Sequence, residues 1–340
     1  MENYELDRSS VLGKGAYSVV CKGMYIGESN EYIENGTVVA VKIVNKLNLS
    51  VKGLGILNNE IDIMNLIKHN AHPNVVRCYD CIVGYSETYI VMELCDLGDF
   101  KSVLGKPMSE KMIKLYFAQL VSGFKYLYDN KIIHRDIKPK NILLSSGDRL
   151  KIADFGFAKI SNKKKLHSST CGSPLYMSPE ILHNNSYGNQ TDLWSIGMIL
   201  YEMVHGQHPY GGCKDMNELK CEIRNPLIMK DGPKECMVLL KKLLEYNASK
   251  RITFQEFFNN SWVVSIGGSD SSSQSQSLSV GTPIVVMGDL SETKTFTNKI
   301  NVIDNYYGHK HVVKVQNNVT DDCIFEMDFD GECQVKKINL

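Results

Sequence analysis

The sequence has no excess of charge of either sign. Its 340 residues include 38 lysines and arginines and 38 aspartates and glutamates, so the formal net charge is zero. A neutral chain has no overall field to attract nucleic acid or an anionic membrane. We therefore expect neither as a partner of the whole protein, although a local basic patch stays compatible with this balance.

Long hydrophobic runs are also missing. The most apolar stretch, residues 193–204, is interrupted by Ser195, Gly197 and Glu202 and is too short to span a bilayer. The first ten residues are polar and lean acidic, which does not fit a signal peptide. These absences predict no membrane span and a cytoplasmic location.

Cysteine is too sparse for a disulfide-stabilised scaffold. Ten cysteines are scattered over the chain, which is typical of reduced thiols in a cytosol-like compartment. Cys78 and Cys81 have Cys-x-x-Cys spacing, but no second pair stands at the distance a zinc site needs. We interpret them as ordinary thiols rather than metal ligands.

Hydrophobic periodicity divides the chain into a sheet-rich first part and a helical second part. Valine-rich or short apolar runs predict strands, and apolar residues at spacings of three and four predict helices, one of them capped by Ser109. The run at 192–205 is apolar all round, which indicates a buried helix. The expected strands are 11–20, 37–44 and 89–92, and the expected helices are 57–68, 109–128, 192–205, 236–244 and 253–259.

Composition changes again near the C-terminus. Residues 265–283 are dominated at their start by serine, glycine and glutamine, which predicts a flexible linker. In the tail, 284–340, Phe325 and Met327 alternate with polar residues ahead of an Asp330-Gly331 turn signal. This pattern predicts a small β-hairpin.

The first motifs lie among the expected strands. Gly13 and Gly15 form a Gly-x-Gly that can bring backbone N–H groups close to phosphates, but Ser18 replaces a third glycine, and alone the motif fits a tight turn as well. Lys42 interrupts an apolar strand. A buried ammonium needs a partner, and Glu60 on the following helix can supply it.

A stronger cluster of polar residues follows. Residues 134–141 read His-Arg-Asp-Ile-Lys-Pro-Lys-Asn, and Asp154-Phe155-Gly156 follows a short apolar strand. Such groups gather on loops that a rigid scaffold positions for chemistry. Together with the glycine loop and Val-Ala-Val-Lys, they occur in the order of the protein-kinase signature. Met-Ser-Pro-Glu at 177–180 stands where that signature has Ala-Pro-Glu.

Residues 4–263 therefore resemble a eukaryotic-type protein kinase domain. Residues 152–159 and 171–177 are similar to those of the ULK-type autophagy-initiating kinases, which are serine/threonine kinases. The resemblance implies an α+β, bilobal fold. A small β-rich N-lobe with one helix would occupy about 4–95, and a larger helical C-lobe about 96–263.

The resemblance implies transfer of the γ-phosphate of Mg-ATP to serine or threonine hydroxyls of protein substrates. Asp136 would be the catalytic base, with Lys138 and Lys42 as catalytic cations. Asn141 and Asp154 would hold Mg²⁺.

The same resemblance places ATP. Glu60 would orient Lys42, the backbones of Glu93 and Cys95 would bind adenine, and Asp99 would bind ribose. The remaining nucleotide contacts would come from the glycine loop and from an apolar slot: Leu12, Gly13, Lys14, Gly15, Ala16, Tyr17, Ser18, Val19, Val20, Ala40, Met92 and Leu143.

The activation segment would run over 154–180. A phosphate on Ser169 could pair with Arg135. Ser173 would support the substrate hydroxyl. The resemblance also implies two structural contacts: Glu180 would pair with Arg251, and Asp192 would bond to the catalytic-loop backbone.

Two other functions remain open on the sequence. A pseudokinase or scaffold would use the tail, 284–340, to recruit a partner, but the full catalytic set favours activity. A small-molecule kinase is disfavoured because Ser173-Pro174 and Ser178-Pro179-Glu180 resemble a segment that binds protein substrates.

Overall fold

The computed structural model describes residues 1–15, 17–160, 173–183, 190–229, 232–267, 323–327 and 333–337. The chain divides into two compact units, 1–273 and 274–340. The first unit holds both lobes expected from the sequence.

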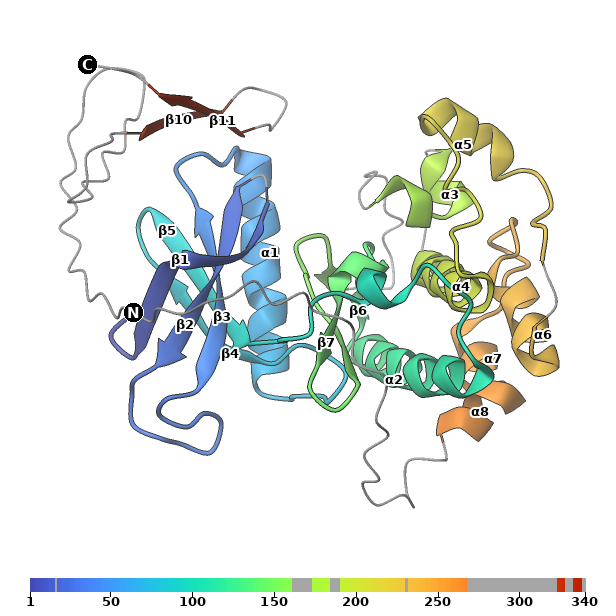
Figure 1. Ribbon diagram of the computed structural model, residues 1–340, viewed down its shortest axis with the longest axis horizontal. Helices are drawn as coiled ribbons and strands as arrows, with labels where there is room; N and C mark the ends of the chain where they lie inside the picture. The colour runs from blue at the N-terminus through green and yellow to red at the C-terminus, as the bar shows by residue number, and fades with distance from the viewer. Residues whose placement is uncertain are drawn as a thin grey trace, which may run out of the picture. The chain divides into compact units, whose positions relative to one another are not determined.

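The N-lobe is an antiparallel sheet of five strands in the order β1-β2-β3-β5-β4, with helix α1 packed beside it (Figure 1). β3 lies in the middle of the sheet, so both of its edges are hydrogen-bonded. The elements are β1 Tyr4–Lys14, β2 Ser18–Tyr25, β3 Val38–Asn45, α1 Val51–Lys68, β4 Cys78–Val83 and β5 Glu87–Glu93.

The expected single strand over 11–20 is wrong in its bounds. β1 ends at Lys14 and β2 begins at Ser18, and the two pair as a hairpin around the glycine loop. The Gly15 N–H donates to the Ser18 carbonyl at 2.7 Å, which closes the turn. A valine-rich pattern runs across this turn, and so the composition alone does not mark it.

Helix α1 begins six residues before the expected start at 57. Ser50 caps it, because its Oγ accepts a hydrogen bond from the Gly53 N–H at 3.1 Å. The first turn is exposed, with Val51 89% exposed, so it carries no buried apolar position that periodicity could detect. The buried stripe from Leu57 to Ile67 is the part that the sequence predicted.

The C-lobe is mainly helical, as expected. Ser109 caps α2 by accepting from the Met112 N–H at 3.4 Å, and all of α4 from Thr191 to His205 is buried. The helices are α2 Glu110–Asp129, α3 Pro179–Leu182, α4 Gln190–His205, α5 Met216–Glu222, α6 Lys234–Leu243, α7 Phe254–Phe258 and α8 Ser261–Gly267, with 3-10 helices η1 Phe100–Val103, η2 Pro139–Asn141 and η3 Pro174–Tyr176. Two short antiparallel pairings complete the described part of this lobe: β6 Ile132–Ile133 with β9 Lys159–Ile160, and β7 Ile142–Ser145 with β8 Arg149–Ile152.

An aromatic core joins α2 to the end of the lobe. Phe117 of α2 stacks on Trp262 of α8 at 5.4 Å between ring centroids, and Ile266 is also buried. Residues 265–267, expected to open the linker, are instead the last turn of α8. The composition did not predict this turn, because Ile266 is its only large apolar residue.

The second unit contains a hairpin of β10 Cys323–Met327 and β11 Cys333–Lys337. The strands are antiparallel, and Met327 pairs with Cys333. The hairpin predicted for the tail is present, while its Asp330-Gly331 turn lies outside the described residues.

Among the described residues, no helix combines the length and the apolar character that a bilayer crossing requires.

Candidate active site

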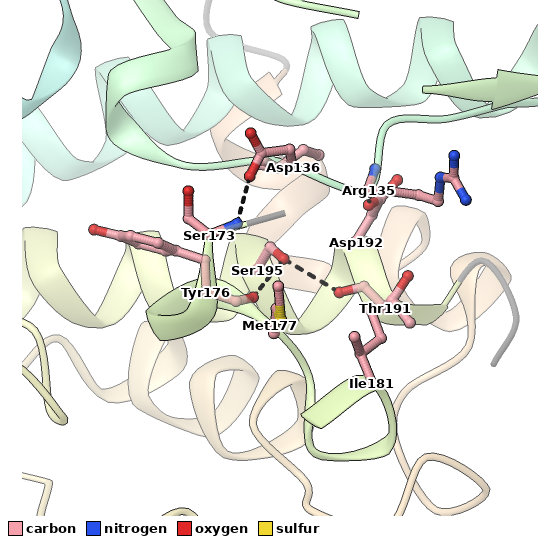
Figure 2. Close-up of a pocket in the computed structure, with 10 residues that line it drawn as sticks. Arg135, Asp136, Ser173, Tyr176, Met177, Ile181, Thr191, Asp192 and Ser195 are labelled. Atoms are coloured by element: carbon pink, nitrogen blue, oxygen red, sulfur yellow. Dashed lines mark hydrogen bonds between the residues drawn. The ribbon is translucent and has the colours of Figure 1, made fainter. Parts of the chain in front are cut away.

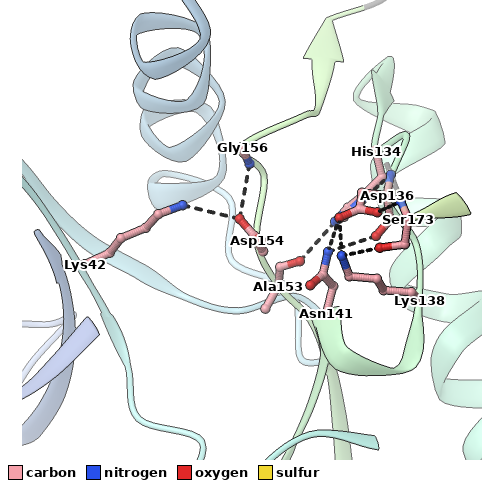
Figure 3. Close-up of polar contacts among 9 residues, drawn as sticks. All are labelled: Lys42, His134, Asp136, Lys138, Asn141, Ala153, Asp154, Gly156 and Ser173. Atoms are coloured by element: carbon pink, nitrogen blue, oxygen red, sulfur yellow. Dashed lines mark hydrogen bonds and ion pairs between the residues drawn. The ribbon is translucent and has the colours of Figure 1, made fainter. Parts of the chain in front are cut away.

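An ion pair links the sheet to α1. Lys42 of β3 places its Nζ 2.6 Å from Oε1 of Glu60, and the two side chains are only 16% and 7% exposed. The same Nζ lies 3.3 Å from Oδ1 of Asp154 (Figure 3). Burial works to lower the pKa of Lys42, but the charges of Glu60 and Asp154 outweigh it and raise the pKa above its ordinary value. The lysine is therefore a fixed cation.

Asp154 follows β8 in the left-handed backbone region, with φ +60°. Its Oδ1 accepts from Lys42 and from the Gly156 N–H at 3.4 Å, and its side chain is 47% exposed. Burial opposes ionisation, yet Lys42 prevails and lowers the pKa of Asp154. The carboxylate is charged, and the described residues leave its Oδ2 without a recorded hydrogen bond.

Asp136 is held from several sides at once. Its Oδ1 accepts from the Ser173 N–H at 2.7 Å, and its Oδ2 accepts from Lys138 Nζ at 2.7 Å and Asn141 Nδ2 at 2.8 Å (Figure 3). Lys138 Nζ also donates to Ser173 Oγ at 2.6 Å. Each carboxylate oxygen has two lone-pair positions, so Oδ2 is filled, whereas the described residues leave one position on Oδ1 for a further donor.

Asn141 links the loop that carries Asp136 to the segment that carries Asp154. Its Nδ2 donates to the Asp136 carbonyl at 2.9 Å as well as to Oδ2, while its own carbonyl accepts from the Ala153 N–H at 2.8 Å. The amide oxygen Oδ1 has no recorded partner among the described residues. Amide and carboxylate oxygens suit Mg²⁺, which keeps several waters and needs few protein ligands. Asn141 and Asp154 therefore fit a magnesium ion, and the described residues contain no cluster of three or more His, Cys, Asp or Glu at which a metal could bind instead.

Asp192 at the start of α4 holds the backbone of the catalytic loop. Its two oxygens accept from the N–H groups of His134 at 2.8 Å and Arg135 at 2.9 Å. Burial raises the pKa of this carboxyl, although the two hydrogen bonds act to lower it. Arg135 has φ +65°, a backbone form that a non-glycine residue rarely adopts, and Asp192 secures it there.

Three of the residues expected to line the adenine slot, Val20, Ala40 and Met92, lie on one face of the N-lobe sheet together with Lys42. Val20 pairs with Lys42, and Ala40 pairs with Met92, while Ala40 and Lys42 are two residues apart on β3. Directly opposite and alternate residues share a face, so all four point to the same side. Leu143 on β7 is half-buried and forms an isolated antiparallel β-bridge with Asp99.

Among the described residues expected to bind the nucleotide, those of the glycine loop are the more exposed. Leu12 is 43% and Tyr17 is 56% exposed, so neither is held in a packed core. Lys14 ends β1, and Ser18 and Val19 begin β2. Ala16 lies outside the described residues.

The residues expected to form the hinge make structural contacts of their own, and the Glu93 N–H donates to the Arg77 carbonyl at 3.0 Å. The Glu93 side chain accepts from Lys151 Nζ at 2.7 Å and from the Arg77 N–H at 2.6 Å. Asp99 caps η1 by accepting from the Lys101 N–H at 3.0 Å, in addition to its expected ribose role. Burial raises the pKa of Cys95 to about 12, so that thiol is protonated at neutral pH.

A small cavity lies under the segment that carries Ser173 (Figure 2). In it, Ser195 Oγ donates to the Tyr176 carbonyl at 2.9 Å and so ties η3 to α4. Its walls come from the catalytic loop, the segment and α4: Arg135, Asp136, Ile137, Ser173, Tyr176, Met177, Ile181, Thr191, Asp192 and Ser195.

A sequence model of the protein kinase domain matches residues 6–263. The chain belongs to the protein kinase family.

Relatives within the family carry names of serine/threonine kinases. ATG1b of Arabidopsis thaliana is 39% identical over 259 residues, which cover 73% of this chain and 35% of that protein. The atg1 kinase of Dictyostelium discoideum is 35% identical over 271 residues, covering 77% and 39%. Human ULK3 is 37% identical over 265 residues, covering 74% and 53%. The resemblance to ULK-type kinases is confirmed, and the chain spans about a third to a half of these relatives' lengths.

The kinase domain also contains a buried anchor that the sequence did not reveal. Glu202 of α4 is fully buried, and it accepts from Lys101 Nζ at 2.8 Å and from the Tyr176 hydroxyl. Glu202 and Ser195 were visible only as interruptions of an apolar run. A charged residue in such a run was the one available signal, because its partners lie far away in sequence.

A second anchor fixes the end of the kinase's activation segment. Arg251 donates to Glu180 through Nη1 at 2.7 Å and Nη2 at 2.9 Å, and the arginine side chain is 0% exposed. Arg251 also donates to the Gln190 and Glu245 carbonyls, both at 3.1 Å. The pair expected from the sequence is thus formed. Residues 161–172, which include Ser169 and Cys171, lie outside the described residues.

Proposed function

We propose that this chain transfers the γ-phosphate of Mg-ATP to serine or threonine hydroxyls of protein substrates. The observation that carries the proposal is the contact of Lys42 with both Glu60 and Asp154, because it joins the phosphate-binding cation of the sheet to the metal-binding carboxylate of the C-lobe. The names of the relatives support the same activity.

Phosphoryl transfer depends on positioning and on charge compensation. Lys42, kept charged and in place by Glu60, binds the α- and β-phosphates. Asn141 and Asp154 offer their free oxygens to Mg²⁺, which offsets the negative charge of the phosphates. The face shared by Ala40 and Met92 receives the adenine ring.

Asp136 receives the substrate hydroxyl. The remaining lone-pair position on Oδ1 accepts the hydroxyl hydrogen, which aims the oxygen at the γ-phosphorus and takes up its proton as the bond forms. Lys138 lies 2.7 Å from the same carboxylate and offsets charge on the transferred group. By resemblance, lysine at this position favours serine and threonine over tyrosine, and Ser173 Oγ, bonded to Lys138, borders the acceptor site.

Activation by phosphorylation is part of the proposal. Arg135 uses its Nε to donate to the Phe157 carbonyl at 2.7 Å. Among the described residues, no hydrogen bond is recorded from its Nη atoms, which leaves them for a phosphate on Ser169. A cytoplasmic location and a partner bound through 284–340 stay predictions.

The test is a transfer assay with peptides that differ only in a serine, threonine or tyrosine acceptor. Purified wild-type chain with Mg-ATP is expected to phosphorylate the first two. Asp136→Asn keeps the side-chain shape and is expected to lower kcat at least about 100-fold. Asp129→Asn, which alters an exposed carboxylate on α2, is the matched control.

Two results would contradict the proposal. ATP binding without transfer by the wild-type chain favours the pseudokinase or scaffold alternative. Transfer by Asp136→Asn at the rate of Asp129→Asn removes Asp136 from its role.

A further inference from the structure

An irregularity in β4 brings two cysteines to one face of the sheet. Residues three apart on a regular strand point to opposite faces. Here the register shifts between Cys78 and Asp80, so Cys78 pairs with Met92 and Cys81 pairs with Ile90. Met92 and Ile90 are alternate residues of β5 and so share one face of the sheet. Both cysteines therefore lie on that face.

That side is the one that faces the ion pair. Ile90 also pairs with Lys42 across β3 and β5, so the two thiols share the face from which Lys42 reaches Glu60. Cys81 packs against Val44, Leu57 and Ile61. Ile61 is the neighbour of Glu60 in α1.

The two thiols are in contact. Their Sγ atoms lie 3.8 Å apart, with Cys78 1% exposed and Cys81 partly exposed. The hydrogen bond between them raises the pKa of Cys78 and lowers that of Cys81, while the charge of Lys68 works to lower both. The more accessible sulfur is therefore also the better nucleophile.

We propose that Cys78 and Cys81 form a redox site at which a hydroperoxide closes a disulfide that weakens the support of α1. The formation of the disulfide is argued from β4 itself and does not depend on kinase activity. The effect on catalysis rests on the proposed function, since it acts through Lys42 and Glu60.

The chemistry is a two-electron oxidation in two steps. The Cys81 thiolate attacks one peroxide oxygen, the O–O bond breaks, and hydroxide leaves and is protonated to water, which gives a sulfenic acid. The Cys78 sulfur, losing its proton, then attacks the Cys81 sulfur and displaces the hydroxyl as a second water. Both thiols are oxidised to one disulfide, and hydrogen peroxide is reduced to two waters.

Closing this bond must draw the sulfurs far inside their present 3.8 Å contact. Cys78 belongs to the large core that continues into the C-lobe, whereas Cys81 lies at its margin against α1. The displacement therefore falls mainly on Cys81 and withdraws it from Leu57 and Ile61. With less support on this face, α1 holds Glu60 less firmly against Lys42.

The experiment treats the purified full chain with hydrogen peroxide and maps its peptides without reduction. We expect a Cys78–Cys81 cross-link with the loss of two hydrogens, faster amide exchange in α1, and a KM for ATP raised at least about fivefold, the lower end of usual coupling between sites. Dithiothreitol should reverse all three changes.

Matched variants separate this pair from other thiols. Cys81→Ser keeps size at a partly exposed position and should abolish the cross-link and the response to peroxide. Cys221→Ser, at an exposed thiol of α5, should respond as wild type does. Cys78→Ala is a second variant, and if it fails to fold, Cys81→Ser still decides the matter.

Absence of the 78–81 cross-link in peroxide-treated wild type would overturn the redox site. A cross-link with unchanged α1 exchange and unchanged ATP KM would overturn the coupling. A peroxide response that persists in Cys81→Ser would assign it to another thiol, such as Cys171, and would also overturn the proposal. If the reduced chain transfers no phosphate, the proposed function fails, whereas the cross-link and the exchange still test the redox site.

Discussion

The buried pair of Glu180 and Arg251 offers a stability test whose size follows from burial. Glu180→Gln removes one charge and keeps nearly the same shape. Arg251 stays behind, fully buried, and among the described residues its remaining acceptors are the neutral carbonyls of Gln190 and Glu245 and the amide oxygen of the new side chain. A buried cation without a counter-charge is costly, because protein surroundings replace water poorly.

Breaking a buried pair from one side destabilises a protein by about 3–5 kcal/mol. We expect the lower end, about 3 kcal/mol, because glutamine still accepts one hydrogen bond. In a domain of this size, each kcal/mol moves Tm by about 2–4 °C, which gives a loss of at least about 6 °C.

The assay is thermal and urea unfolding of the two variants side by side with the wild type. Asp129→Asn breaks an ion pair with Lys125 whose side chains are both 54% exposed. Such an i,i+4 surface pair contributes only about 0.3–0.5 kcal/mol, so its Tm should fall by no more than about 2 °C. Equal shifts for the two variants would refute the argument that burial sets the difference.

Three further predictions concern metal, phosphate and pH. Asp154→Ala should abolish Mg-ATP-dependent transfer without unfolding the C-lobe, which a rate assay with circular dichroism checks; normal transfer at ordinary Mg²⁺ contradicts its role as a metal ligand. Phosphatase treatment or Ser169→Ala should lower activity, and Arg135→Ala should make activity indifferent to the phosphate, as mass spectrometry paired with rates will show; full activity without phosphate on 168–170 rejects the switch. Burial lowers the pKa of His208 from 6.5 to about 4, so the unfolded chain binds this proton first as pH falls; stability should drop by at most about 3 kcal/mol between those values, and urea unfolding of His208→Gln should lack that part of the slope.

The sequence was informative wherever a local pattern carries a physical constraint. The stripe from Leu57 to Ile67 and the capped start at Ser109 follow from helical period and hydrogen-bonding chemistry, and both appear in the structure. The local pattern did not predict the exposed first turn of α1 or the last turn of α8, where Ile266 is one buried residue among polar ones. Element ends depend on caps and tertiary packing more than on period.

The site shows the same division. Lys42, Asp136 and Asp154 could be predicted because each sits in a short motif of chemically specific residues. Glu202 could not, because its partners Lys101 and Tyr176 are separated from it by 101 and 26 residues. Only the folded chain brings these groups together, and no spacing rule relates them.

The two central carboxylates differ through their surroundings rather than through their own chemistry. Asp136 is almost fully enclosed and accepts donors from Ser173, Lys138 and Asn141, so its orientation is fixed and one lone-pair position is left for a hydroxyl. Asp154 is about half exposed and, among the described residues, accepts hydrogen bonds through Oδ1 alone, so under the proposed function Oδ2 would be open to a cation. A proton acceptor needs fixed aim, whereas a magnesium ligand needs free lone pairs and room for water. Asn141 orients the first carboxylate through its nitrogen, and under the proposed function its oxygen would bind the cation, so that one side chain would serve both.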